Sequence, residues 1–366
     1  MKIQIQRSAL LEALKKIQGI APGKGTLPVL QNVLFETGDG KVTLTTSDLD
    51  VTMRAEAICE VTEEGRTTIP VKLLSAAVSK LAEGTVKITV GANDKADVVS
   101  GNTKFKIAGV KAEEFPRLPG IPADAAKYVI KAKDLKDMLG KVRYAASQDD
   151  TRKTLQGTLI SFKGGTATVV STDGRRLALV KREMDVGGVS EFSVIIPKKT
   201  VGVLMGELGG DGDVEMVMGG SQIVIRLDGM TVYSKLFDDA YPNYGQVIPK
   251  ETKYTIPIDR IALLEALDRV SVLSESSDAK SVKLHFEQGM LTIKSNAADI
   301  GEATDELAVK YDGEEMDAMF NASYMMDALK VIADDVVSFS MNDGTHPVVL
   351  KDSKDFLYVL MPLRIC

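Results

Sequence analysis

Alternating apolar residues that run directly into a helix-like pattern occur three times along the chain. The three stretches are MKIQIQRSALLEALKKI from Met1, KYVIKAKDLKDMLGKV from Lys127 and KYTIPIDRIALLEALDRV from Lys253. Alternation predicts a strand, and apolar residues spaced by three and four positions predict a helix. Each copy is therefore expected to start with a strand that leads into a helix.

A second strand-to-helix pattern also recurs, in RTTIPVKLLSAAVSKL, FSVIIPKKTVGVLMGEL and DAMFNASYMMDALKVI. Between the two landmarks lie three stretches that alternate around a Gly-bearing turn, which is typical of hairpins: VLFETGDGKVTLTTSD, TLISFKGGTATVVSTD and VKLHFEQGMLTIKSN. Two or three more strands are expected after each second helix. The predicted helices cover 8–17, 70–82, 131–144, 197–208, 259–273 and 321–333.

The landmarks repeat with a period of about 125 residues, which indicates whole domains and not the short units of a solenoid. We predict three domains, 1–122, 123–250 and 251–366, joined by the Pro-containing stretches FPRLPGIPADAA and AYPNYGQVIPKET. Each copy reads as two similar halves. The fold class is α+β, with antiparallel sheets that carry helices on one side.

Composition narrows the classes of protein. The 366 residues are 44% hydrophobic and 26% charged, as in a soluble globular protein. No apolar run reaches the roughly 20 residues of a membrane span, and the start does not read as a signal peptide. Cys59 and Cys366 are the two cysteines, which suits a reducing cytosol, and with two histidines a His/Cys metal site is not expected.

The charge is distributed unevenly. The six predicted helices hold 14 Lys or Arg and 8 Asp or Glu, a net charge of +6, whereas the whole chain carries −6 and the remainder therefore −12. Net negative charge argues at first against nucleic acid as a partner. Lysines suit exposed helix faces in any protein, but a basic helix layer that repeats three times also fits a surface for phosphates.

Two stretches resemble ligand-binding loops without meeting their requirements. GIAPGKGT (19–26) has its glycines one residue too close for a phosphate-binding loop, lacks Ser or Thr after the lysine, and follows a helix. GGDGD (209–213) lacks the further acidic ligands of a calcium loop and reads as a tight turn.

No catalytic set is evident. Asp48 and Asp173 stand at corresponding places in TTSDLD and VSTDGRR, where they are expected to cap equivalent turns. His285 and His346 lie in strand-like or turn-like segments without obvious partners for nucleophilic catalysis.

Five ordered motifs resemble the bacterial sliding clamps, the beta subunits of DNA polymerase III. The motifs are TLPVLQNVLF (26–35), STDGRRLALV (171–180), DDAYPNYGQVIP (238–249), FNASYMMDAL (320–329) and the terminal YVLMPLR, and the likeness covers essentially the whole chain. It implies three tandem repeats of the DNA-clamp fold, with antiparallel sheets outside and two helices per domain inside. Two chains would join head to tail as a homodimer, a six-domain ring around double-stranded DNA.

The resemblance implies a non-enzymatic processivity factor without cofactors, cytoplasmic and with no membrane partner. Inner Lys and Arg would contact phosphates without reading bases, which permits sliding. The positions that match the family's DNA contacts are Lys24, Lys72, Arg152, Lys198 and Lys199. Lys153 and Thr154 stand where some relatives carry aromatic residues.

The resemblance also implies a hydrophobic cleft for short linear motifs of partners: the replicative DNA polymerase, the clamp loader, repair polymerases and mismatch-repair proteins. Met361 would supply an adaptable wall. The matching positions are Leu155, Thr172, Gly174, Arg175, Leu177, Pro242, Val247, Val359, Leu360, Met361, Pro362, Leu363 and Arg364. Gln246 departs from the Arg of some relatives, and Cys366 extends the end by one residue.

Ring closure would join domain 1 of one chain to domain 3 of the other. Phe105 and Ile107, in the alternating stretch KFKIAG, match the family's apolar contact, and Val272 and Leu273 fall where the partner surface is expected. Ordinary core packing at a strand and a helix end is the alternative for these four residues.

Two other kinds of protein stay possible at this point. One is a three-domain cytosolic enzyme whose cleft at 155–177 and 359–364 binds a small substrate, although no acid, base or metal set supports it. The other is a repeat scaffold that binds proteins but never DNA. Retention on circular but not linearised DNA, after treatment with a clamp loader, would separate the clamp from both.

Overall fold

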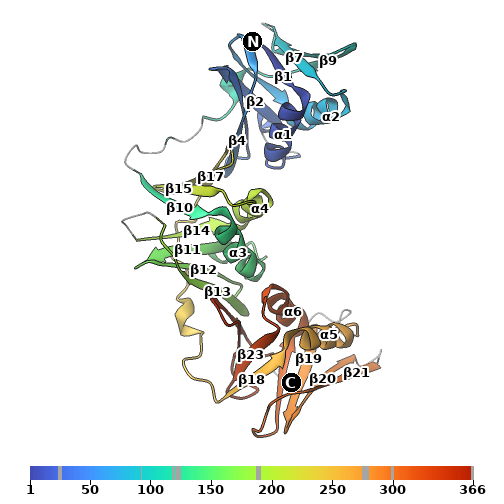
Figure 1. Ribbon diagram of the computed structural model, residues 1–366, viewed down its shortest axis with the longest axis vertical. Coiled ribbons are helices and arrows are strands. Elements are labelled where there is room, and N and C mark those ends of the chain that lie inside the picture. The colour runs from blue at the N-terminus through green and yellow to red at the C-terminus, as the bar shows by residue number, and fades with distance from the viewer. Residues whose placement is uncertain are drawn as a thin grey trace. The chain divides into compact units, whose positions relative to one another are not determined.

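The computed structural model describes residues 1–23, 27–91, 93–117, 120, 125–186, 191–273, 280–297 and 301–363. Its elements follow one order three times: a strand, a helix, a set of strands, a second helix and three strands (Figure 1). Copy one carries one extra short strand in its middle set. The predicted α+β class and its threefold repetition are confirmed.

Six α-helices lie in the described residues, and each begins and ends within two residues of its predicted window. They are α1 (Arg7–Ile17), α2 (Val71–Lys80), α3 (Ala132–Val142), α4 (Lys198–Glu207), α5 (Arg260–Ser271) and α6 (Ala322–Val331). Short 3-10 turns lie at η1 (Pro28–Gln31), η2 (Ala112–Glu114), η3 (Arg143–Ala145), η4 (Lys153–Gln156) and η5 (Tyr244–Gln246).

The strands of the described residues form four antiparallel sheets. The first is β5 (Glu60–Glu63), β1 (Lys2–Gln6), β7 (Thr85–Val90), β8 (Lys95–Ser100) and β9 (Thr103–Ala108), in spatial order. The second is β10 (Ala126–Lys131), β15 (Asp213–Gly219), β16 (Gln222–Leu227), β17 (Met230–Lys235), β4 (Val51–Ile58), β3 (Lys41–Ser47), β2 (Asn32–Gly38) and β6 (Arg66–Pro70).

The third sheet is β14 (Phe192–Pro197), β11 (Gly157–Lys163), β12 (Thr166–Thr172), β13 (Arg176–Glu183), β25 (Phe356–Leu360), β24 (Val348–Lys351), β23 (Val336–Met341) and β18 (Tyr254–Asp259). The fourth is β21 (Gly301–Ala308), β20 (Met290–Ala297), β19 (Ser281–Glu287) and β22 (Met316–Asn321). Both long sheets therefore contain strands from two of the predicted domains.

The chain divides into two compact units. One holds residues 1–133 and 206–236, and the other holds 134–205 and 237–366. Within the first unit β17 pairs with β4, and within the second β25 pairs with β13. In both cases the last strand of one predicted domain joins the fourth strand of the domain before it. The three domain boundaries themselves stay a prediction.

Helix pairs cover the sheets within each unit. In the first unit α1 packs on α2, β3 and β4, and in the second α5 packs on α6, β20 and β21. Leu10, Leu14 and Ile17 lie on one face of α1 and are fully buried, as their spacing requires. The alternating Ile3 and Ile5 of β1 are buried as well, so the apolar pattern predicted both the helix and the strand.

Corresponding aspartates cap corresponding turns, as predicted. Asp48 Oδ1 accepts hydrogen bonds from the backbone N–H groups of Asp50 (3.0 Å) and Val51 (2.7 Å), between β3 and β4. Asp173 Oδ1 accepts from Arg175 (2.9 Å) and Arg176 (3.0 Å), between β12 and β13. These carboxylates therefore shape equivalent turns in two copies of the repeat.

Candidate functional site

An apolar row crosses the third sheet in its domain 2 part. Leu179, Val170, Leu159 and Ile195 lie directly opposite one another on β13, β12, β11 and β14. All four are buried, and with Leu177 and Val359 they form one hydrophobic cluster. Since Val359 lies on β25, the cluster combines residues far apart in the sequence.

The segment after β17 packs on this row. Phe237, Tyr241, Tyr244 and Ile248 contact the cluster yet are only partly buried. Phe237 forms an isolated β-bridge with Ile195, to whose carbonyl oxygen its N–H donates at 3.2 Å. We call the row together with these packed side chains the Leu159 surface. It combines a rigid apolar floor with half-exposed aromatic side chains, which suits a ligand with large apolar groups.

The chain end is held beside this surface by backbone hydrogen bonds. In the β13–β25 pair Leu177 lies opposite Val359 and Arg176 opposite Leu360. Beyond the strand, the Met361 N–H donates to the Arg175 carbonyl oxygen at 3.0 Å. The Leu363 N–H donates to the carbonyl oxygen of Met319 on β22 at 2.7 Å. A terminal apolar run therefore forms part of the fold instead of fraying.

The predicted cleft residues fall into three groups. Buried in the described chain are Thr172, Leu177, Val359 and Leu360; half-buried are Leu155, Met361, Pro362 and Leu363; exposed are Gly174, Arg175, Pro242 and Val247. Arg364 lies outside the described residues. Of the buried members, Leu177 and Val359 belong to the hydrophobic cluster of the row, and the half-buried and exposed positions are the ones more open to a ligand.

Arg152, predicted as a DNA contact, lies beside cleft residues. A side chain at Gly174, whose φ is +86°, would come within 3.2 Å of Arg152 Nη1. Arg152 and Gly174's neighbour Arg175 line one pocket of about 370 Å³ with Asp149 and Asp173. Sequence reasoning assigned these residues to different sites, whereas the fold makes them neighbours.

Arg176 is a buried residue that sequence reasoning missed. Its guanidinium donates to Asp173 Oδ2 (3.1 Å), Asp327 Oδ2 (2.7 Å) and the carbonyl oxygen of Tyr144 (2.7 Å). It lies 4.0 Å from the ring centroid of Tyr324. Alternation along β13 puts Arg176 on the same face as the buried Ala178 and Val180, a pattern that could have revealed a buried arginine in need of acidic partners.

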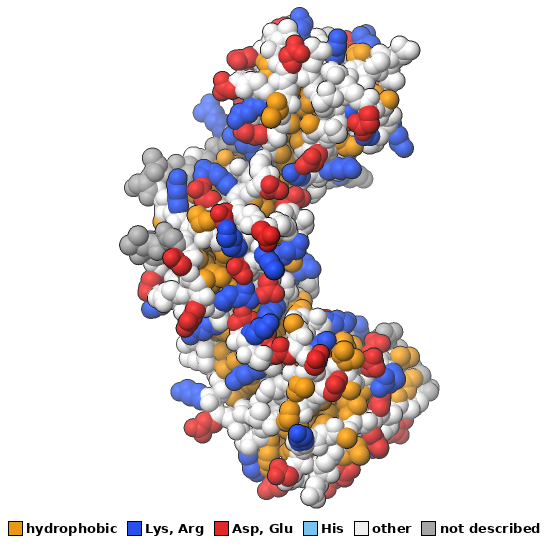
Figure 2. All heavy atoms as spheres, viewed as in Figure 1, with side chains coloured by type: hydrophobic (Ala, Val, Ile, Leu, Met, Phe, Trp, Pro, Cys, Tyr) orange, Lys and Arg blue, Asp and Glu red, His pale blue; other side chains and the backbone are white. Residues whose placement is uncertain are grey.

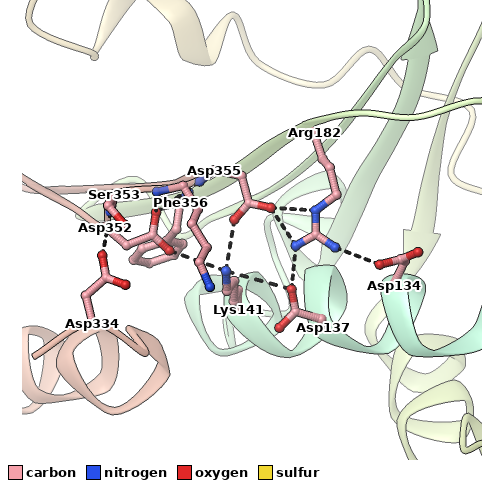
Figure 3. A network of polar contacts seen from close by, with 10 residues as sticks. Asp134, Asp137, Lys141, Arg182, Asp334, Asp352, Ser353, Asp355 and Phe356 are labelled. Atoms are coloured by element: carbon pink, nitrogen blue, oxygen red, sulfur yellow. Dashed lines mark hydrogen bonds and ion pairs between the residues drawn. The ribbon is translucent and has the colours of Figure 1, made fainter.

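A second ion cluster stabilises the opposite end of β13 (Figure 3). Lys141 of α3 lies 2.9 Å from Asp355 Oδ1 and 3.4 Å from Asp352 Oδ2, both in the turn between β24 and β25. Arg182 donates to the Asp355 carboxylate at 2.5 Å and also contacts Asp137 at 2.6 Å. The cluster thus ties the start of β25 to α3 and β13, and so helps to position the chain end.

The charges of this cluster stabilise each other. Burial would raise the pKa of Asp355, but hydrogen bonds from Lys141 and Arg182 outweigh it and hold the pKa below its ordinary value. Burial likewise opposes the charge of Lys141, whose pKa is nevertheless raised by the hydrogen bond to Asp355. Lys141 is only 7% exposed. This lysine of the predicted basic helix layer therefore forms ion pairs inside the fold and does not face solvent.

The other predicted DNA contacts lie at helix starts. Lys72 is exposed in the first turn of α2, and its ammonium lies beside Gly23, the residue before Lys24. Lys24 itself lies outside the described residues. Lys198 and Lys199 are exposed in the first turn of α4, and Lys198 donates to Gln148. The sequence motifs thus place basic groups at the same end of two equivalent helices.

The helix layer also carries acidic groups. Figure 2 shows Lys and Arg intermingled with Asp and Glu over the face on which α3 and α4 are seen. A pocket of about 450 Å³ between α3, α4 and α6 brings Lys198 together with Arg143 and Lys330. Arg143 and Lys330 come from different copies of the repeat. The sequence alone did not indicate that they lie near Lys198.

Within the described residues, β9 and β21 are two of the eight strands at sheet edges: β9 pairs only with β8, and β21 only with β20. On β9, Phe105 is half-buried and Ile107 is 4% exposed, so Ile107 belongs to the core of its own domain. Val272, at the end of α5, is 67% exposed, and Leu273 beside it is half-buried. The edges β9 and β21 therefore remain available for pairing.

Catalytic or metal-binding sites are not evident in the described ranges. No group of three metal-binding side chains is present among these residues. The histidines do have partners, contrary to the sequence reading: His285 Nδ1 lies 2.8 Å from Asp317, and His346 Nδ1 lies 2.8 Å from Asp343. No helix within the same residues is long and apolar enough to cross a membrane.

Comparison with known proteins matches all three copies to one family. The N-terminal, central and C-terminal domains of the DNA polymerase III beta subunit match residues 1–119, 129–243 and 245–364. The beta sliding clamp of Chlamydia pneumoniae is 32% identical over 365 residues, which is 100% of this chain and 99% of the relative. That of Pseudomonas aeruginosa is 31% identical over 370 residues, covering 100% of both.

Solved structures agree. The crystal structure of the DNA polymerase III beta subunit from Pseudomonas aeruginosa has a TM-score of 0.95 at 30% identity, with 100% of each chain covered. The Bacillus subtilis sliding clamp has a TM-score of 0.96 at 26% identity, also over 100% of each chain. The fold is thus that of a DNA clamp. The chain belongs to the DNA polymerase III beta subunit family, the bacterial sliding clamps.

The ion cluster around Asp355 gives a test of stability. Replacing Asp355 by Asn leaves Lys141 and Arg182 short of one buried carboxylate, so the free energy of unfolding should fall by about 2–3 kcal/mol at neutral pH. Because the folded pKa of Asp355 is depressed, its contribution exists above the unfolded pKa of about 4 and is lost as pH falls through the folded pKa. Urea unfolding at several pH values measures both.

The control for this test is Asp312→Asn, an exposed carboxylate in the same unit. It should change the free energy of unfolding by less than about 0.5 kcal/mol. Equal losses in the two variants, or a D355N loss that persists undiminished at low pH, would contradict the role given to Asp355.

Proposed function

We propose that this chain works as a DNA-encircling processivity factor that holds its partners through the Leu159 surface and catalyses no reaction itself. A polymerase that dissociates from its template while bound to this chain stays at high local concentration and binds the template again. The chain itself therefore needs no catalytic activity to support repeated synthesis. The observation that carries the proposal is the Leu159 surface, with its apolar floor and half-exposed rim. The residues proposed for ligand contact are Val247, Pro242, Met361 and Pro362.

The occupant is a short linear segment with one or two large apolar side chains. Met361 offers a polarizable, adaptable wall, and such walls accept several different ligands. The proposed ligands are segments of the replicative polymerase, the clamp loader, repair polymerases and mismatch-repair proteins, which would compete for one surface. Action on chromosomal DNA places the chain in the cytoplasm.

Dimerisation follows the rule that joins domains inside the chain. Twice, the last strand of one copy pairs with the fourth strand of the copy before it, as β17 does with β4 and β25 with β13. By the same rule β9 would pair with β21 of a second chain, and β21 with its β9. This head-to-tail arrangement pairs both edges, which otherwise expose backbone donors and acceptors.

DNA would be held by charge without base recognition. The proposed contacts are Lys24, Lys72, Arg152, Lys198 and Lys199, with Arg143 and Lys330 of the helix pocket added. Contacts to phosphate are insensitive to sequence and weaken as salt rises. Weak contacts suit a protein whose retention comes from encirclement and which must still move along the duplex.

A charge beside the Leu159 surface should weaken partner binding strongly. Val247 is 37% exposed, and Val247→Asp would put a carboxylate where the ligand's apolar group is proposed to lie. A fluorescein-labelled peptide ending in Leu-Phe should therefore bind at least about tenfold more weakly. Fluorescence polarisation measures this. Ile58→Asp, at an exposed site on β4, is the control, and equal affinity of the two variants would refute the assignment.

The edge of β9 should control the oligomeric state. Phe105→Asp would place a charge at the proposed β9–β21 contact and shift the chain from a dimer of twice 39.4 kDa to a monomer. Analytical ultracentrifugation at micromolar concentration is the measurement. Val129→Asp, 41% exposed on the edge strand β10, should leave the dimer intact. A monomeric wild-type chain would argue against closure altogether.

Charge reversal at the helix starts should weaken DNA contact. The double variant Lys72→Glu with Lys198→Glu is expected to bind duplex DNA about tenfold more weakly at low salt and to show a flatter salt dependence. Lys87→Glu, exposed on β7, serves as the matched control in the same gel-shift titration. DNA affinity that is the same in all three proteins would exclude these lysines as contacts.

A further inference from the structure

The apolar row of domain 2 has a counterpart in domain 1 with different chemistry. Leu34 corresponds to Leu159, because each is the third residue of its strand. Leu159 lies opposite Val170 on the next strand, and Leu34 lies opposite Thr45. Across the second sheet the counterpart row reads Arg54, Thr45, Leu34 and Thr68, where domain 2 has Leu179, Val170, Leu159 and Ile195. Three of the four apolar residues are thus polar in domain 1.

The covering segment is repeated as well. Thr68 forms an isolated bridge with Val110, as Ile195 does with Phe237. Behind Val110, Ala112 and Phe115 pack with Leu34 and Val29 in a small hydrophobic cluster. Domain 1 therefore has the same construction as the Leu159 surface: a strand row with the segment after the last strand folded over it.

This construction leaves a groove of about 380 Å³ in the first unit. Its floor includes Leu34 and Phe115, and its walls carry Arg54, Arg66 and Arg117 together with Glu36 and Glu113. We call it the Leu34 groove. The groove is lined by three guanidinium groups and two carboxylates, so it carries an excess of positive charge. Its floor is apolar.

One polar group of this groove lacks a partner. Arg54 Nε is buried, with no hydrogen-bond partner among the described residues. The nearest carboxylate oxygen to Arg54 is Glu36 Oε2, at 4.0 Å, and Glu36 also lies 3.0 Å from Arg66 Nε. Buried donors in native proteins are normally satisfied, and each one left unpaired is costly. A bound acceptor would satisfy the Arg54 guanidinium.

We propose that the Leu34 groove is a second docking site, which binds a short acidic peptide segment of a partner protein. A carboxylate of the peptide accepts hydrogen bonds from the Arg54 guanidinium, and Arg117 pairs with a second carboxylate. An apolar side chain next to the first carboxylate packs toward Leu34 and Phe115. Bidentate contact between guanidinium and carboxylate gives both strength and geometry.

The repeat explains why the two sites take different ligands. Domain 2 places Leu179 where domain 1 places Arg54, so the same backbone frame selects apolar groups in one copy and carboxylates in the other. In domain 3 the matching row is Thr304, Lys294, Lys283 and Met319, which has no apolar floor. One chain could thus hold two partner segments of different chemistry at once, which raises avidity.

Fluorescence polarisation on the full chain tests the proposal. The probe is the fluorescein-labelled peptide Glu-Asp-Leu-Ala-Glu-Asp, which lacks the Leu-Phe pair used for the Leu159 surface, compared with its uncharged analogue Gln-Asn-Leu-Ala-Gln-Asn. Arg54→Gln should weaken binding of the acidic peptide about tenfold and leave the analogue unchanged. Arg226→Gln, an exposed arginine of the same sheet that lies outside the groove, is the control and should bind both peptides as the wild type does.

Two further variants make the result decisive. Arg117→Gln changes an exposed side chain and should weaken the acidic peptide about threefold even if Arg54→Gln impairs folding. Val247→Asp, which blocks the Leu159 surface, should leave acidic-peptide binding unchanged, so failure of this site is distinguishable from failure of the other. Unchanged affinity in both arginine variants, or loss of the acidic peptide in V247D, would overturn the proposal.

Discussion

Backbone pairing between copies of the repeat is the constraint on which the rest of this structure depends. At each join inside the chain, the final strand of one copy hydrogen-bonds to the fourth strand of the copy before it. Main-chain hydrogen bonds do not depend on side-chain identity, so the joins persist although the three copies have diverged. The β13–β25 pair in turn brings Val359 into the cluster of the Leu159 surface, and Met361 beyond it hydrogen-bonds to Arg175.

Buried charge reinforces this pair at both ends of β13. Arg176 reaches Asp327 of α6 and Arg182 reaches Asp355 of the β24–β25 turn, so both arginines link residues of predicted domains 2 and 3. Ion pairs that are largely removed from water contribute little net stability over apolar packing, but breaking one is costly. Arg182 thus ties the β24–β25 turn to β13, and Arg176 ties α6 to β13.

The repeat also separates shared structure from individual function. Every copy has a strand row covered by the segment that follows its last strand or the chain end, yet the row is apolar in domain 2, mixed in domain 1 and charged in domain 3. Substitutions at a few row positions change the ligand without disturbing the sheet, because the register is fixed by neighbouring buried residues. The copies share one fold, and the ligand that each copy binds is decided by the side chains on its surface.

Much of this protein was determined by the sequence alone. The spacing of apolar residues predicted six helices within two residues of their bounds, and alternation predicted the hairpins, because burial of one face is a local periodic requirement. The ordered motifs identified the family, but of the cleft residues named from them only Leu177 and Val359 belong to the hydrophobic cluster of the Leu159 surface. Asp48 and Asp173 were recognised as turn caps from their equivalent positions.

Only the tertiary structure decided which of these residues meet. Arg152 lies against Gly174. Lys141, predicted as part of the basic helix layer, forms an ion cluster instead. The guanidinium of Arg176 lies between the rings of Tyr144 and Tyr324. Such contacts join positions from 22 residues apart to more than 200, as Lys141 and Asp355 do at a separation of 214. The local spacing of apolar residues shows which face of a segment is buried. Contacts between residues far apart in the sequence depend instead on how the sheets join.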